Sequence, residues 1–255
     1  MRGDCTVVGH VFGDSGPPVV ILHGLAGSAT EFVPTARELS ADHRVLVVDQ
    51  RGHGCSTQRP EDLSRRAFVD DVIAQIEAFA DEPVTLVGQS MGGDTAMRVA
   101  HARPDLVRHL VMVEAHPDGD DGGMSAQALE DYFRSWPALF PDRGQATIAM
   151  GDSPLARAWA ADLEPVDGGF APRFEASVMR RVIEPVHRCA LRAWGELTVP
   201  VTVILGERGD LSAARRQRLA KTRPSARFLS VPAAGHDPHL DNPAGWIASL
   251  RAAVS

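Results

Sequence analysis

Residues 84–100, VTLVGQSMGGDTAMRVA, contain the pattern on which the interpretation of this chain rests. Residues 84–87 form a short apolar, β-branched run, which is typical of a fully buried strand. Gly-Gln-Ser-Met-Gly follows at 88–92, and residues 93–102 form a helical pattern with small residues on one side. A strand, a sharp turn and a helix around G-x-S-x-G are the parts of a nucleophile elbow, with Ser90 as the nucleophile.

The turn is expected to hold Ser90 in a strained backbone conformation that leaves no room for bulky neighbours two residues away. Gly88 and Gly92 meet that steric demand. Ser90 Oγ would then stand at the carboxyl edge of a sheet, over the positive N-terminus of its helix, where developing negative charge is favoured.

Buried strands and helices alternate on both sides of this segment. We expect short edge strands within 5–12 and buried strands at 18–22, 44–48, 107–113, 199–205 and 226–231. Helices are expected at 30–39, 65–80, 212–222 and 243–253. This alternation predicts an α/β fold with a mostly parallel sheet and helices on both faces. Ligands bind such sheets at the carboxyl ends of the strands.

The alternation is interrupted between residues 115 and 189. Helical patterns lie near 126–136, 154–163 and 173–186, between loops rich in Gly, Pro and Asp, and the glycine-rich stretch 119–123 is expected to be a loop. We therefore predict a helical cap at 115–189, inserted into a core formed by 1–114 and 190–255. A hydrophobic acyl or aryl substrate is expected to contact Gly24 and the cap residues Tyr132, Phe133, Trp136 and Trp159.

Composition excludes several classes of function. The net charge of −7 argues against a nucleic-acid partner. Three scattered cysteines argue against a disulfide framework and a zinc site, and no metal or cofactor motif is visible. The N-terminus lacks the apolar core of a signal peptide, and no run of about 18 apolar residues predicts a membrane span. We expect a cytoplasmic protein without a cofactor, and the sequence leaves a homodimer open.

A serine nucleophile needs a base and a group that orients the base. His236 is the candidate base, because it follows the last predicted strand; His239 is the neighbouring decoy. Two carboxylates could orient it. Glu114 ends an apolar strand and should be buried, where a carboxylate needs a partner, so it is preferred. Asp210, in the polar turn after the strand at 199–205, is the alternative.

Acyl transfer also needs donors for the oxyanion. The backbone N–H of Met91, directly after the nucleophile, is one candidate. The second is Leu25, in the loop after the strand at 18–22, where neighbouring glycines allow the backbone to approach a substrate closely.

Four motifs in this order resemble the α/β-hydrolase superfamily: HGLAGS at 23–28, DQRGHGCS at 49–56, GQSMGG at 88–93 and Gly-His at 235–236. The resemblance covers the chain except the cap and implies a Ser-acid-His triad, an oxyanion hole from Leu25 and Met91, and no cofactor. Many relatives carry the acid at the position of Gly209, whereas a subset, among them some bacterial esterases and a mycotoxin lactone hydrolase, carries it at the position of Glu114.

Serine in place of aspartate counts against epoxide hydrolases and haloalkane dehalogenases of this fold, which need a carboxylate nucleophile. The sequence therefore predicts a serine hydrolase of a carboxylic ester or lactone, acting through an acyl-enzyme. Thioesters remain possible substrates. The same triad leaves open a C–C bond hydrolase, a lyase, a cofactor-free peroxidase, an acyl-transferring cyclase or thioesterase, and a non-catalytic small-molecule receptor.

Overall fold

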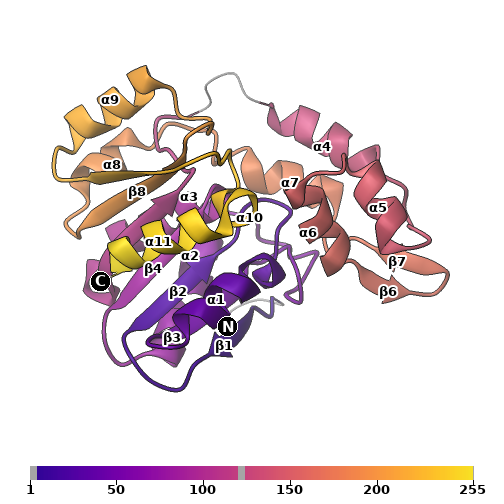
Figure 1. Cartoon of the computed structure of the whole chain (residues 1–255), viewed down its shortest axis with the longest axis horizontal. Helices are drawn as coiled ribbons and strands as arrows, with labels where there is room; N and C mark the ends of the chain where they lie inside the picture. Colours follow the sequence, from indigo (N-terminus) through magenta and orange to yellow (C-terminus); the bar gives the residue numbers. More distant parts are fainter. Residues whose placement is uncertain (1–4, 120–123, 255) are drawn as a thin grey trace.

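The computed structural model describes residues 5–119 and 124–254, and its centre is a seven-stranded sheet (Figure 1). The strand order is β1-β3-β2-β4-β5-β8-β9, with β1 antiparallel to β3 and the other neighbours parallel. The strands are β1 (Val8–Phe12), β2 (Pro18–Leu22), β3 (Arg44–Asp49), β4 (Val84–Gln89), β5 (Val107–Val113), β8 (Val201–Gly206) and β9 (Arg227–Val231). Each predicted core strand is present, with its start or end moved by no more than two residues, and the mostly parallel fold is confirmed.

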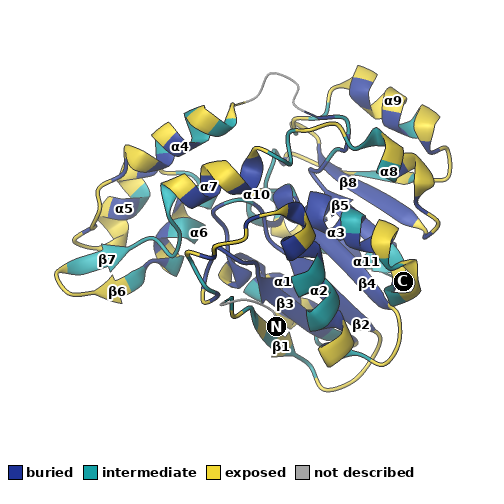
Figure 2. Cartoon of the chain, turned by 180° about the vertical axis from the view of Figure 1, so that it is seen from behind, coloured by how far each residue is buried: buried dark blue, intermediate teal, exposed yellow. Residues whose placement is uncertain are grey.

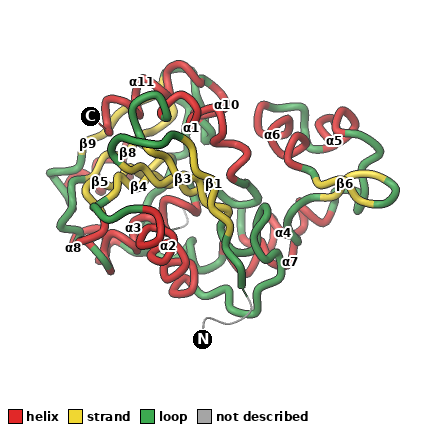
Figure 3. Tube along the Cα trace, turned by 90° about the horizontal axis from the view of Figure 1, so that it is seen from below, coloured by secondary structure: helices red, strands yellow, loops and turns green. Residues whose placement is uncertain are grey.

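Successive side chains of a strand point to opposite faces, so the sheet has two cores. Helices lie on both sides of the sheet (Figure 3). On β2, Val20 and Leu22 pack towards the helices of one layer, while Val19 and Ile21 pack towards the other. The first layer comprises α2 (Arg65–Phe79), α3 (Met91–Ala102), α8 (Leu191–Glu196) and α9 (Ala213–Thr222). The second layer comprises η1 (Ala29–Phe32), α1 (Val33–Leu39) and α11 (Pro243–Val254). The short η2 (Pro104–Leu106) leads into β5, and α10 (Pro238–Asp241) precedes α11.

The segment between β5 and α8 lies beside the carboxyl edge of the sheet as a separate cluster, called the cap below (Figure 2). Its helices are α4 (Ala126–Arg134), α5 (Arg143–Ala149), α6 (Pro154–Asp162) and α7 (Ala176–Ile183). We did not predict α5 or the hairpin of β6 (Glu164–Val166) and β7 (Gly169–Ala171). The hairpin strands are only three residues long and none of their residues is buried, so they carry no hydrophobic alternation.

Of the glycine-rich stretch 119–123, residues 120–123 lie outside the described part. Among the described residues no helix is long and apolar enough to cross a membrane.

The turn between β4 and α3 has the strained geometry expected for a nucleophile elbow. Ser90 has φ 51° and ψ −117°, a backbone conformation that non-glycine residues rarely adopt. The Ser90 N–H donates to the carbonyl of Val113 on β5 at 2.8 Å. A Cβ on Gly88 would lie 2.3 Å from the Gly92 carbonyl oxygen, and a Cβ on Gly92 would lie 2.5 Å from the His23 carbonyl oxygen. Close backbone contact on both sides of Ser90 therefore requires glycine.

Gly92→Ala should destabilise the fold by about 1–3 kcal/mol, because the new methyl group would meet rigid backbone atoms. The free energy of unfolding, measured by urea titration, tests this. Gly195→Ala in helix α8 is the matched control, since its Cβ would meet only Thr222 Cγ2 at 3.6 Å, an ordinary contact. Equal stability of the two variants would show that the close approach at the elbow is not needed.

Candidate active site

A cavity of about 710 Å³ lies at the carboxyl ends of the core strands, between the sheet and the cap. Ser90 follows β4, Glu114 follows β5, Asp210 lies in the turn after β8 and His236 lies in the loop after β9. All four side chains line this cavity. Parallel strands end at one edge of the sheet, so the fold brings together residues that are up to 146 positions apart, from 90 to 236.

Two backbone amides can serve an oxyanion at Ser90. Leu25 lines the cavity from the loop after β2, and Met91 is the first residue of α3. Neither N–H has a backbone acceptor among the described residues. A Cβ on Gly24 would lie 3.4 Å from Ser90 Cβ, so the Leu25 loop passes directly beside the nucleophile. Preorganised amide donors of this kind stabilise the negative charge that develops on a carbonyl oxygen under attack.

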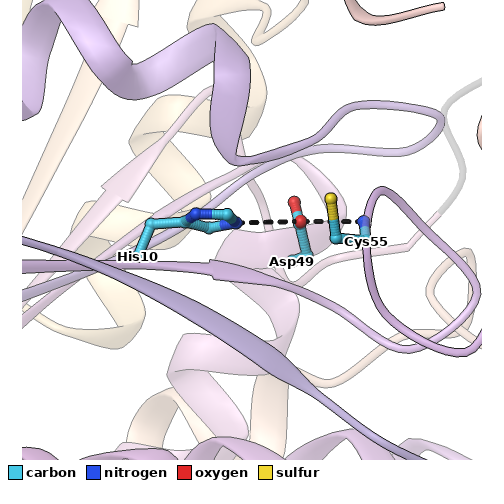
Figure 4. A group of neighbouring side chains, drawn as sticks. All are labelled: His10, Asp49 and Cys55. Atoms are coloured by element: carbon cyan, nitrogen blue, oxygen red, sulfur yellow. Dashed lines mark hydrogen bonds and ion pairs between the residues drawn. The ribbon is translucent and has the colours of Figure 1, made fainter. Parts of the chain in front are cut away.

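The loop that carries Leu25 is anchored by Asp49 at the end of β3. Figure 4 shows Asp49 between His10 and Cys55. One carboxylate oxygen of Asp49 accepts the N–H of Ala29 at 2.7 Å, and the other accepts the N–H of Cys55 at 2.9 Å. His10 Nε2 lies 3.2 Å from the second oxygen. His10, Asp49 and Cys55 are spaced closely enough to hold a metal ion, as are Glu114, Asp210 and His236. Because both oxygens of Asp49 already accept backbone amides, its evident role is to fix the two loops.

His236 lies between two carboxylates, both of which the sequence had offered as the acid. Its Nδ1 is 2.9 Å from Asp210 Oδ2 and 3.8 Å from Glu114 Oε2. Neither contact has the alignment of a hydrogen bond from Nδ1, so both are ion pairs. The Glu114 side chain is fully buried, whereas 61% of the Asp210 side chain is exposed. Distance alone thus favours Asp210, and burial favours Glu114.

The same carboxylates set the basicity of His236. Burial by itself lowers the pKa of the imidazole, but the adjoining Asp210 and Glu114 and the charge of Asp237 outweigh this and raise the pKa above its ordinary value. Contact with His236 lowers the pKa of Asp210. The environment therefore stabilises the imidazolium that forms when a histidine takes the proton of a serine hydroxyl.

The cap supplies most of the apolar wall of the cavity. Tyr132, Phe133 and Trp159 line it, as does Gly24 from the core. Trp136, which we expected in the pocket, is not among the lining residues. It packs inside the cap against Phe133 and Trp159, with ring centroids 5.2 and 5.3 Å away. Trp136 lies after the end of α4, where helical periodicity no longer indicates which way a side chain points.

Sequence reasoning missed three acidic residues of the cavity wall, Glu31, Asp94 and Asp237. Glu31 follows Ser28, which caps the short helix η1, so its spacing suggested only an ordinary helix start. Asp237 directly follows His236, and its carboxylate accepts a hydrogen bond from Gln89 Nε2 at 3.1 Å. The decoy His239 is buried beside Phe32, with ring centroids 4.2 Å apart, and does not line the cavity.

Comparison with known proteins agrees with this architecture. The sequence profile of the alpha/beta hydrolase fold matches residues 17–164. A 2-(acetamidomethylene)succinate hydrolase from Mesorhizobium japonicum is 29% identical over 231 residues, covering 87% of this chain and 82% of that protein. The mouse sn-1-specific diacylglycerol lipase ABHD11 is 29% identical over 240 residues, covering 89% of this chain and 77% of the lipase.

Similarity in three dimensions extends over nearly the whole chain. The crystal structure of E-2-(acetamidomethylene)succinate hydrolase superposes with a TM-score of 0.90 at 27% identity, covering 99% of this chain and 96% of the other. The sheet order, the elbow and the sequence profile lead to one assignment. The chain belongs to the α/β hydrolase fold family and is a hydrolase.

Proposed function

We propose that this hydrolase cleaves a carboxylic ester or lactone with a hydrophobic acyl or aryl part. The observation that carries the proposal is the convergence of Ser90, His236 and Leu25 on one cavity with an apolar wall, with the amide of Met91 directly after Ser90. The cap, which we take as 115–189, would receive the hydrophobic part of the substrate. The core segments 1–114 and 190–255 would supply the reacting groups.

In the proposed reaction His236 takes the proton of Ser90 while Oγ attacks the carbonyl carbon. The amides of Leu25 and Met91 stabilise the resulting oxyanion. The leaving alcohol then takes the proton from His236, and an ester between the acyl group and Ser90 remains. A water molecule, deprotonated by His236, attacks that ester; His236 then returns the proton to the leaving Ser90 Oγ, and the carboxylic acid is released.

We assign the orientation of His236 to Glu114 and a weaker, auxiliary role to Asp210. The two carboxylate oxygens of Glu114 accept the N–H groups of Gly206 at 2.6 Å and Asp210 at 3.1 Å, which fixes the side chain in place. The exposed carboxylate of Asp210 has water competing for it. A Cβ on Gly209 would lie 1.9 Å from Glu114 Oε1, so a side chain at 209 and the observed Glu114 exclude each other. This exclusion supports Glu114, because position 209 is where many relatives carry the acid.

The relative named for 2-(acetamidomethylene)succinate suggests a second candidate substrate, a dicarboxylate. Its two negative charges would need cationic partners in a buried site. No Lys or Arg is among the described residues that line the cavity. Residues 120–123, outside the described part, contain neither. Protonated His236 is already flanked by Glu114 and Asp210, so the cavity favours an uncharged ester or lactone. Among the described contacts none favours a C–C bond hydrolase, lyase, peroxidase, cyclase or thioesterase, or a receptor.

Ser90→Ala should reduce kcat for p-nitrophenyl esters by about 10⁴-fold or more while the protein stays folded, because the acyl acceptor is lost. Labelling by a fluorophosphonate should disappear in the same variant. An acyl-chain series of these esters, with thermal melting as the control for folding, measures both effects. Unchanged turnover in Ser90→Ala would overturn the mechanism, and labelling without turnover of any ester or lactone would overturn the substrate class.

Glu114→Gln should lower kcat/KM by about 10³- to 10⁴-fold, since the imidazole loses its fixed carboxylate partner. Asp210→Asn should lower it by only about tenfold, as expected for an exposed ion pair. Parallel kinetics on both variants decide the assignment. If Asp210→Asn shows the larger loss of kcat/KM, Asp210 is the triad acid.

The pH dependence of kcat/KM follows from the raised pKa of His236. Only neutral His236 can accept a proton, so activity should rise with pH and reach its half-maximum above the ordinary histidine value near 6.5. Removing a carboxylate destabilises the imidazolium, so this midpoint should move to lower pH in the residual activity of Asp210→Asn. A midpoint that is the same in wild type and variant would contradict the electrostatic role of Asp210.

A further inference from the structure

Glu31 lines the wall of the cavity with a buried carboxyl group that lacks part of its hydrogen bonding. It lies in η1, directly after the loop that carries Leu25, and only 4% of its side chain is exposed. It lines the same cavity as Ser90. Its Oε1 has no hydrogen-bond partner among the described residues, and its Oε2 lies 3.6 Å from His239 Nε2. Buried polar atoms are almost always hydrogen-bonded, so Oε1 lacks a partner that the described residues do not supply.

The surroundings of Glu31 disfavour its negative charge. Two carboxyl groups face it, Asp162 from α6 of the cap and Asp237 from the loop after β9, and His23 lies at the end of β2. His239 supplies little positive charge, because burial lowers its pKa to about 4. Burial raises the pKa of Glu31 to about 7, although the charge of His23 opposes this. Near neutral pH a large share of Glu31 is therefore a neutral carboxylic acid, which can both donate and accept a hydrogen bond.

The remaining walls of the cavity also disfavour a negatively charged ligand. Its described lining includes five carboxyl groups, Glu31, Asp94, Glu114, Asp210 and Asp237, and no Lys or Arg. The other lining residues are mostly apolar side chains of the core and the cap. Asp94 is itself paired with Arg65 and Arg98, and protonated His236 is already flanked by Glu114 and Asp210. A substrate carboxylate beside Glu31 would therefore be desolvated next to a group of like charge.

We infer that Glu31 is a specificity-determining residue, whose carboxyl group binds an uncharged polar group on the acyl part of the substrate and excludes a carboxylate there. The inference rests on the proposed ester hydrolase function and narrows its substrate class. An acyl part that is mostly apolar but carries a hydroxyl or a carbonyl oxygen would pack against the apolar wall and form a hydrogen bond with Glu31. Glu31 binds substrate in this account and takes no part in proton transfer at Ser90.

A matched pair of substrates tests the inference: methyl p-nitrophenyl adipate, which is neutral, and mono-p-nitrophenyl adipate, which carries a carboxylate at the same distance from the reacting ester. At pH 8 the neutral diester should be preferred by about 100-fold or more in kcat/KM, because like charges in a buried site repel strongly. The preference should grow between pH 6 and pH 8 as Glu31 ionises. The pKa of His236 is raised to about 10, so its charge stays nearly constant over this range, and its role as a base scales the turnover of both substrates alike.

Glu31→Gln keeps the shape and hydrogen-bonding capacity of the side chain but cannot ionise. This variant should reduce the preference for the neutral ester by about tenfold or more and remove its pH dependence, mainly through KM for the charged ester. Glu38→Gln is the matched control, since Glu38 lies on the neighbouring helix α1 with 60% of its side chain exposed. It should leave the ratio and its pH dependence unchanged.

A purely structural Glu31 would lower activity on both esters alike and leave the ratio unchanged, which would overturn the inference. Equal turnover of the two esters by the wild-type enzyme would overturn it as well, and this measurement does not depend on whether a variant folds. Protection of Ser90 from fluorophosphonate labelling by dimethyl adipate but not by adipate gives a readout that requires no ester hydrolysis. Loss of ester turnover with this protection intact would count against the proposed function and not against the role of Glu31.

Discussion

The site depends on one close contact, between the N-terminus of α3 and the ends of the neighbouring strands. Gly88 and Gly92 let the backbone turn at Ser90 within van der Waals distance of the carbonyl groups of residues 22 and 23. The hydrogen bond from Ser90 N–H to Val113 ties the turn to β5. Because this contact fixes Ser90 and the loop of Leu25 relative to each other, the proposed oxyanion donors are held in place before any reaction.

A second constraint lies at the opposite side of the cavity, where β5 and β8 end. Glu114 has φ 44°, a strained conformation that turns its side chain under the loop after β8. Gly206 and Asp210 bind its carboxylate through their amides, and Gly209 leaves the space for it. Glu114 and the loop therefore form one unit, and a carboxylate at position 209 would require Glu114 to be replaced. This interdependence explains how one fold accommodates two positions for the same carboxylate.

Features that depend on a local sequence pattern, such as buried strands and the residues that follow them, could be predicted from the sequence. Buried strands such as 18–22 and 107–113 are continuous apolar runs, and the reactive residues follow those strands directly. The features that were missed depend on packing at a distance. The direction of the Trp136 ring is set by Phe133, Trp159 and Phe174, and the hairpin after α6 has no buried face. Likewise, Glu31 becomes part of the cavity only because α10 and the cap close around η1.

The most direct test of this account is mass spectrometry of the enzyme quenched in acid during turnover of a p-nitrophenyl ester, followed by proteolysis. The account predicts an acyl group on the peptide that contains Ser90, formed at the rate of the p-nitrophenol burst and lost at the steady-state rate. Rapid p-nitrophenol release without any acylated Ser90, or with the acyl group on another residue, would contradict the central claim that the elbow serine is the nucleophile.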